Sequence, residues 1–142
     1  RQKRQVLIPA SLSTRTRVKM KQNNALILVA HGSRKASSNE EVKSLTEELE
    51  ALLGEKYALV TAAFLEFTDP SLEEGMLSCV EKSASEIVIL PYFLASGNHV
   101  TRDIPEAVQK VQASHPEVKI TLKGHIGSAS GMVSLLSDMA VS

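Results

Sequence analysis

The chain has 142 residues, of which 43% are apolar and 23% charged, so we expect one soluble globular domain with a sizeable core. No apolar run approaches the ~20 residues that span a bilayer. The single cysteine, Cys79, excludes an intrachain disulfide and a cysteine-based metal cluster. The formal net charge is zero, but residues 1–22 hold seven of the sixteen bases and no acid, which leaves a net charge of −7 on the rest. An acidic domain without Trp is not typical of nucleic-acid binding, and we expect neither a nucleic-acid nor a membrane partner.

Residues 1–22 form a basic leader with no apolar period and without the apolar core of a secretory signal. Three interpretations stay open: a disordered or processed leader, a transit-peptide remnant, or an electrostatic arm for an anionic partner. We treat residues 23–142 as a single domain and expect the leader to be dispensable. The expected location is the cytoplasm, or a plastid if the leader is a transit-peptide remnant.

The first half of the domain begins with a short, continuously apolar strand at Ala25–Ala30. Apolar residues at helical spacing then predict a helix from Ser38 to Leu53, with Ser38 and Glu41 as a capping box. A second apolar strand is predicted over Tyr57–Leu65.

The second half repeats this alternation. A helix is predicted from Asp69-Pro70, with the proline at its first position, to about Ser83. The next strand is Glu86–Leu90, and Thr101 is expected to cap a helix that runs to about Ala113. A weaker strand at Val118–Leu122 and a last helix at Ser128–Ala140 complete a (βα)₄ order.

Strands with so little alternation are typical of a parallel sheet covered on both faces. We therefore predict an α/β fold: an open, doubly wound, flavodoxin-like sheet of four parallel strands in the order 2-1-3-4, with helices on both faces. In such sheets ligands bind outside the carboxyl ends of the strands, at the switch point between strands 1 and 3.

Histidines follow both strands at the predicted switch point: His31 after the first strand and His99 after the third. Glu66 follows the second strand beside them. Two imidazoles and a carboxylate are ligands for a divalent transition metal and proton acceptors near neutral pH. Alternatively, each histidine bonds only its own backbone, and Glu66 caps a helix or pairs with Arg34 or Arg102.

Other site types find less support. The sequence has no GxGxxG, no P-loop and no GxSxG, so neither a nucleotide cofactor nor a serine nucleophile is expected, and Ser33 is assigned to backbone or substrate binding. His115 is expected at the surface and Cys79 in the core. His125 lies after the fourth strand, farther from the switch point, and its role stays open.

Three segments, ALILVAHGSR, AAFLEFTDPSLEEG and IVILPYFLASGNHVTRDIP, resemble the short form of the CbiX-type sirohydrochlorin chelatases, which are class II chelatases. The resemblance covers residues 23–142 and implies a chelatase domain that inserts Co²⁺, or Fe²⁺ or Ni²⁺, into sirohydrochlorin for cobalamin, siroheme or nickel-tetrapyrrole synthesis. It implies that His31 and His99 bind the metal and accept pyrrole protons, and that Glu66 is the acidic catalytic residue. The fourth segment, GHIGSASG, departs from the family's Leu-Gly-x-x-Pro turn.

Sirohydrochlorin carries eight carboxylates, so an acidic domain needs local cations to bind it. We assign this role to Arg34 and Arg102, which flank the two histidine motifs with Lys35 beside them. Ser33 and Asn98 are assigned to substrate binding as well. A solvated surface role is the alternative for the two arginines.

Two other functions compete with the enzyme: a metal or tetrapyrrole carrier that uses the same histidines without turnover, and a flavodoxin-like small-molecule binder. We also expect a homodimer, because long forms of the family resemble two such units fused in one chain. The candidate interface is the crevice side of the domain, near the loops after the third and fourth strands and the apolar face of the last helix, formed by Met132, Leu135, Leu136 and Met139. Ordinary packing within the chain is the alternative for that face.

Overall fold

A computed structural model describes residues 23–142 of the chain; the predicted basic leader lies outside the described residues. Within them, four strands form one sheet: β2 (Asn24–Ala30), β3 (Leu59–Phe64), β4 (Glu86–Pro91) and β5 (Lys119–Leu122). All neighbouring strands pair in parallel, in the order β3-β2-β4-β5. This confirms the predicted order 2-1-3-4.

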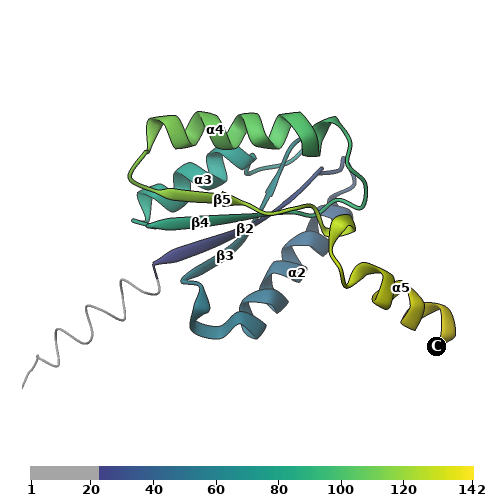
Figure 1. Cartoon of the computed structure of the whole chain (residues 1–142). Coiled ribbons are helices and arrows are strands. Elements are labelled where there is room, and N and C mark those ends of the chain that lie inside the picture. Colours follow the sequence, from purple (N-terminus) through teal and green to yellow (C-terminus); the bar gives the residue numbers. More distant parts are fainter. Residues whose placement is uncertain (1–22) are drawn as a thin grey trace, which may run out of the picture.

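Helices cover the two faces of the sheet unequally. The helices α3 (Leu72–Glu81) and α4 (Ile104–Ser114) lie side by side on one face, and α2 (Ala36–Leu53) lies on the other (Figure 1). The last helix, α5 (Met132–Val141), projects away from the body of the molecule (Figure 1). Helices on both faces were predicted, but α5 does not join the layer of α2.

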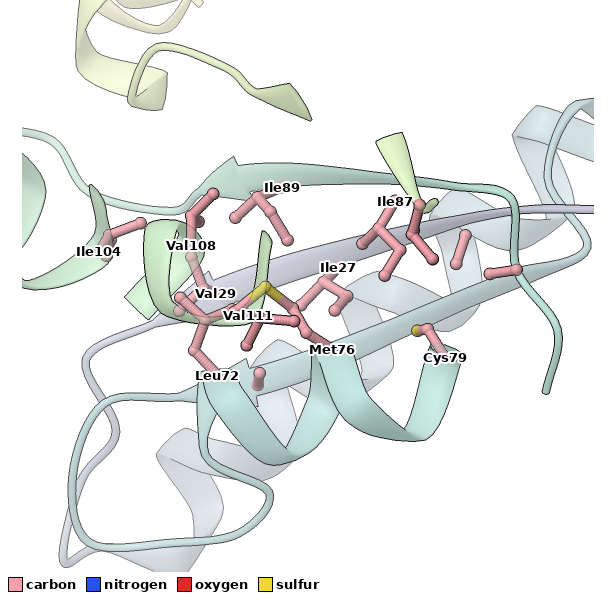
Figure 2. Packing of buried hydrophobic residues seen from close by; sticks show 14 residues of the cluster. Ile27, Val29, Leu72, Met76, Cys79, Ile87, Ile89, Ile104, Val108 and Val111 are labelled. Atoms are coloured by element: carbon pink, nitrogen blue, oxygen red, sulfur yellow. The ribbon is translucent and has the colours of Figure 1, made fainter. Parts of the chain in front are cut away.

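The two faces of the sheet bury alternate residues of the same apolar strands. Ile27, Val29, Ile87 and Ile89 contribute to the larger core under α3 and α4, where Met76 is fully buried (Figure 2). On the other face a smaller cluster packs against Leu49 and Leu53 of α2; its buried members are Leu26 of β2, Val60 of β3 and Val88 of β4. Because both faces are covered, the strands show no polar alternation.

The predicted starts of the first two helices are wrong. The helix α2 begins at Ala36, with Lys35 at the N-cap and no side-chain cap, so Ser38 already lies in the first turn. The helix α3 begins at Leu72 and has its capping box at Ser71 and Glu74, not at Pro70. Pro70 stays outside because its carbonyl accepts the backbone N–H of Phe64 at the end of β3 (2.9 Å).

The starts of the last two helices differ as well. A π-helical turn over His99–Asp103 precedes α4, and the Thr101 hydroxyl donates to the Gly97 carbonyl within it instead of capping the helix. The last helix begins at Met132 because a 3-10 turn, η3 (Ile126–Ser128), comes first. No helix in residues 23–142 is both long and apolar enough to span a membrane.

The side chain of Met76 on α3 is fully buried against the sheet, so a substitution there is expected to lower stability strongly. Met76→Ala is expected to lower the free energy of unfolding by about 2–5 kcal/mol, because it leaves a cavity that the sheet cannot close. Leu52→Ala is the matched control: Leu52 is 84% exposed on α2, and its loss should cost less than about 0.5 kcal/mol. Urea denaturation of both variants measures the difference, and equal stabilities would contradict this packing.

Candidate metal centre

Side chains from three strand ends meet at the carboxyl edge of the sheet. His31 follows β2, Glu66 follows β3, and His99 opens the turn after β4. Their ligand atoms all lie within 4.8 Å of one another. The Glu66 Oε2 atom is 2.7 Å from His31 Nε2 and 3.8 Å from His99 Nε2, and the two imidazole centroids are 4.8 Å apart. The chain thus brings together the three residues expected at the switch point.

The loops after β2 and β3 are held against each other by the backbone. The Glu66 N–H donates to the His31 carbonyl (2.9 Å), which extends the pairing of the two strands by one residue. Gly32 adopts a φ of +93°, and a Cβ at this position would lie 2.0 Å from the Glu66 carbonyl oxygen. Only glycine allows so close an approach, so Gly32 sets the relative positions of His31 and Glu66.

His99 is oriented by a second carboxylate. Its Nδ1 lies 2.8 Å from Asp103 Oδ2, and the other Asp103 oxygen accepts from Arg102 Nε at 3.1 Å. The hydrogen bonds from Arg102 and His99 hold the pKa of the Asp103 carboxyl below its usual value. An ionised carboxylate only accepts hydrogen bonds, so His99 donates to it from Nδ1, and Nε2, 3.8 Å from Glu66 Oε2, is the nitrogen placed to bind a metal.

Removal of the Asp103 carboxylate is therefore expected to weaken metal binding without removing a ligand. Asp103→Ala should raise the Kd for Co²⁺ by about ten-fold or more, the usual cost of losing a group that orients a ligating histidine. Asp103→Asn should retain part of the affinity, because the amide oxygen still accepts from Nδ1. Glu106→Ala is the matched control, one turn further along α4 and exposed. Cobalt titrations that give one Kd for all four proteins would contradict this role.

Two of the predicted substrate-binding residues have structural partners. The backbone N–H of Ser33 donates to the Asn39 side chain and its carbonyl accepts from it (2.9 and 2.8 Å), while the Ser33 hydroxyl accepts from the Lys35 N–H. The Arg34 guanidinium lies 4.9 Å from the centre of the Phe67 ring. That ring in turn meets the edge of His31 at 5.9 Å, so Arg34 borders the cluster.

The other predicted residues divide between the site and the surface. Arg102 contacts the cluster indirectly, through Asp103, and Asn98 is exposed immediately before His99. His115 was expected at the surface but is half-buried; its Nδ1 lies 3.4 Å from Glu117 Oε2, away from the cluster. His125 precedes η3 and lines a separate cavity. Glu66 neither caps a helix nor pairs with an arginine in these contacts; its carboxylate faces the two histidines.

Sequence reasoning missed Asp103, Asn39 and Phe67. The spacing His99-x-x-x-Asp103 after a strand is a signal that could have identified Asp103, because residues four apart share a helix face. Asn39 is buried and holds the loop around Ser33, and Phe67 has a left-handed backbone with φ of 71°. Neither residue carries a motif that would have revealed its place.

An open parallel sheet with two imidazoles and a carboxylate at its switch point defines a doubly wound α/β protein with a candidate transition-metal site. The side chains of His31, Glu66 and His99 are 38–47% exposed, so the site is open to a large second ligand. The chain belongs to the CbiX family, whose model matches residues 25–141.

Curated relatives match the same region. The chain is 30% identical to a sirohydrochlorin ferrochelatase of Priestia megaterium, over 81% of this chain and 42% of the relative. It is 32% identical to a sirohydrochlorin cobaltochelatase of Sulfolobus acidocaldarius, over 81% of this chain and 88% of the relative. A chloroplastic sirohydrochlorin ferrochelatase of Arabidopsis thaliana is 27% identical, over 81% of this chain and 50% of the relative.

Solved structures share the fold. A cobalt complex of the sirohydrochlorin chelatase SirB from Bacillus subtilis subspecies spizizenii superposes with a TM-score of 0.73 at 26% identity, covering 83% of this chain and 50% of SirB. A CbiX protein from Marinobacter aquaeolei gives 0.67 at 27% identity, covering 83% of this chain and 94% of that chain. The chain thus spans about half the length of SirB, and only 42% of the Priestia ferrochelatase.

Proposed function

We propose that the chain inserts a divalent metal ion, Co²⁺ or alternatively Fe²⁺ or Ni²⁺, into sirohydrochlorin. The observation that carries the proposal is the open cluster of His31, Glu66 and His99. Membership of the CbiX family supports it, because relatives matched over the same residues are named sirohydrochlorin ferrochelatase and cobaltochelatase. The ion and the tetrapyrrole are both substrates, and the chemistry needs no organic cofactor.

In the proposed reaction the ion first binds the Nε2 atoms of His31 and His99, and the proton shared by His31 Nε2 and Glu66 passes to solvent water, which leaves the Glu66 carboxylate free to accept a proton later. The tetrapyrrole nitrogens then replace these protein ligands and the remaining waters. Two pyrrole N–H protons must leave as the metal enters, and the released imidazoles and the Glu66 carboxylate are placed to accept them. An open site suits this exchange, whereas a closed tetrahedral site would retain the metal.

The substrate carboxylates need cations and donors around the cluster. Arg34 lies at the rim, held over Phe67, and Arg102 lies on the other side beside Asp103. A guanidinium forms paired, charge-assisted hydrogen bonds with a carboxylate, which suits both positions. We therefore assign substrate binding to four residues: Ser33, Arg34, Asn98 and Arg102.

We also propose a homodimer. A flat macrocycle needs two walls, and one sheet edge supplies only one of them. The exposed apolar residues of α5 support a second copy, because such a helix face is typical of an interaction site. For location we propose the cytoplasm, with a plastid as the alternative, which the chloroplastic relative supports.

An anaerobic insertion assay with sirohydrochlorin in large excess over protein tests the function. Metallated product that exceeds the protein concentration many-fold is expected for at least one of the three ions. Product limited to one equivalent per protein chain would instead indicate a metal or tetrapyrrole carrier that uses the same two histidines without turnover. No product with any of the three ions would contradict both. The affinity series of first-row metals favours Ni²⁺ over Co²⁺ over Fe²⁺ at any such site, so the ion used in the cell depends on supply.

Glu66→Gln tests the carboxylate separately. Glutamine cannot take up a proton, so insertion should slow. Because it keeps the size and one acceptor oxygen of glutamate, the loss should be smaller than for either histidine-to-alanine change. Glu117→Gln, at the surface beside His115, is the matched control and should leave the rate unchanged. A Glu66→Gln rate equal to wild type would remove Glu66 from the mechanism.

A further inference from the structure

The helix α5 presents an apolar face that no other part of residues 23–142 covers. Met132, Leu135, Leu136 and Met139 share that face at helical spacing, and none of the residues of α5 is buried. Leu135, Leu136 and Met139 are 53–67% exposed. Exposed aliphatic side chains gathered on one helix face mark an interaction site rather than a random surface.

On the face of the sheet where α2 lies, part of the apolar surface is not covered by that helix. That helix covers β3 and β2, where Leu49 and Leu53 pack on the smaller core, whereas the opposite face has two helices. Beside α2 lies an apolar cavity of about 310 Å³. Its floor is formed by Leu28 and Leu90, and Tyr92, Ile126 and Ala129 line it as well. We call it the sheet groove.

The chain enters α5 from a fixed point. The N–H of Gly127 in η3 donates to the Phe93 carbonyl (3.0 Å), and a Cβ at Gly127 would lie 1.7 Å from the Leu94 carbonyl oxygen. This contact holds η3 against the loop after β4. From there α5 runs outward, away from α2 and the sheet (Figure 1). Its own sheet groove therefore remains without a helix.

We propose that α5 lies in the sheet groove of a second copy, while the helix of that copy occupies the groove of the first. One chain carries both the helix and the gap, and reciprocal exchange across a two-fold axis fills both at once. A membrane surface does not fit, because α5 has no Lys or Arg and its one charge, Asp138, lies away from the apolar face. The inference rests on the proposed homodimer and states how its two copies join.

Sedimentation equilibrium of the full chain tests whether α5 holds the dimer. Wild type is expected at about 31 kDa, twice the 15.4 kDa of one chain. Leu135→Glu with Leu136→Glu should sediment near 15 kDa with unchanged helical content, because two carboxylates cannot enter an apolar groove. Ser134→Glu with Ser137→Glu, on the other face of the same helix, is the matched control and should remain a dimer. A monomeric wild type, or a leucine variant that remains a dimer, would overturn the proposal.

Cross-linking separates exchange from simple pairing of two α5 helices. Chains with Leu136→Cys are mixed with chains with Tyr92→Cys, unfolded and refolded together, and treated with a short bis-maleimide. Exchange predicts a covalent pair of one chain of each kind, whereas helix pairing would give covalent pairs of Leu136→Cys chains alone and overturn it. Cys79 does not compete, because it is buried and burial raises the pKa of its thiol. Neither readout needs sirohydrochlorin, so failure of the exchange is distinguishable from failure of the proposed activity.

Discussion

Replacing His31 or His99 with alanine is expected to lower the rate of metal insertion by about ten-fold or more, which is at least ~1.4 kcal/mol of lost barrier reduction. Each change removes one of the two imidazoles that the proposed mechanism uses to bind the ion and accept a proton. Because both side chains are about two-fifths exposed, the free energy of unfolding should change by less than about 1 kcal/mol. Initial rates of product absorbance and urea denaturation measure the two quantities.

His115→Ala is the matched control for both variants, since its imidazole contacts Glu117 and lies outside the cluster. It should insert metal at the wild-type rate. A variant of His31 or His99 that retains more than about a tenth of that rate would show that the residue has another role.

Gly32→Ala is expected to destabilise the fold by about 3 kcal/mol or more, an unusually large effect for one added methyl group. The backbone at this position has a φ of +93°, and the new Cβ would fall 2.0 Å from the Glu66 carbonyl oxygen. The two loops must separate to admit it, and this moves His31 away from Glu66. Insertion should therefore fall together with stability.

Gly97→Ala provides the control in the other histidine loop, because a Cβ there meets no atom within 4 Å and the backbone needs no left-handed conformation. Its free energy of unfolding, measured by urea denaturation, should match wild type within about 0.5 kcal/mol. Equal midpoints for the two alanine variants would mean that Gly32 does not set the spacing of the loops.

Much of the fold could be predicted because the strands have distinctive, continuously apolar sequences. Ala25–Ala30 and Glu86–Leu90 are continuously apolar, and helices between parallel strands leave few topologies. Helix starts were harder to predict, because they depend on contacts distant in sequence. The Pro70 carbonyl is used by β3, so α3 starts later, at a capping box that the sequence also contains at Ser71 and Glu74.

Some residues of the candidate site could likewise be predicted from the sequence, and others could not. His31, Glu66 and His99 could be found because each follows a recognisable strand, and topology alone places strand ends together. Asp103 could not be placed without the π-helical turn that brings its carboxylate to His99. The outward course of α5 follows from no local signal either. From the sequence alone, the apolar face of this helix is equally compatible with packing inside the chain and with an interface.

X-ray absorption of the Co²⁺-loaded protein tests most directly the claim that His31, Glu66 and His99 form one metal site. The wild-type spectrum should show two imidazoles among the metal ligands, with oxygen donors completing the shell. His31→Ala and His99→Ala should each show one imidazole, and His115→Ala should still show two. A wild-type spectrum without imidazole scattering, or one that neither substitution changes, would contradict the account.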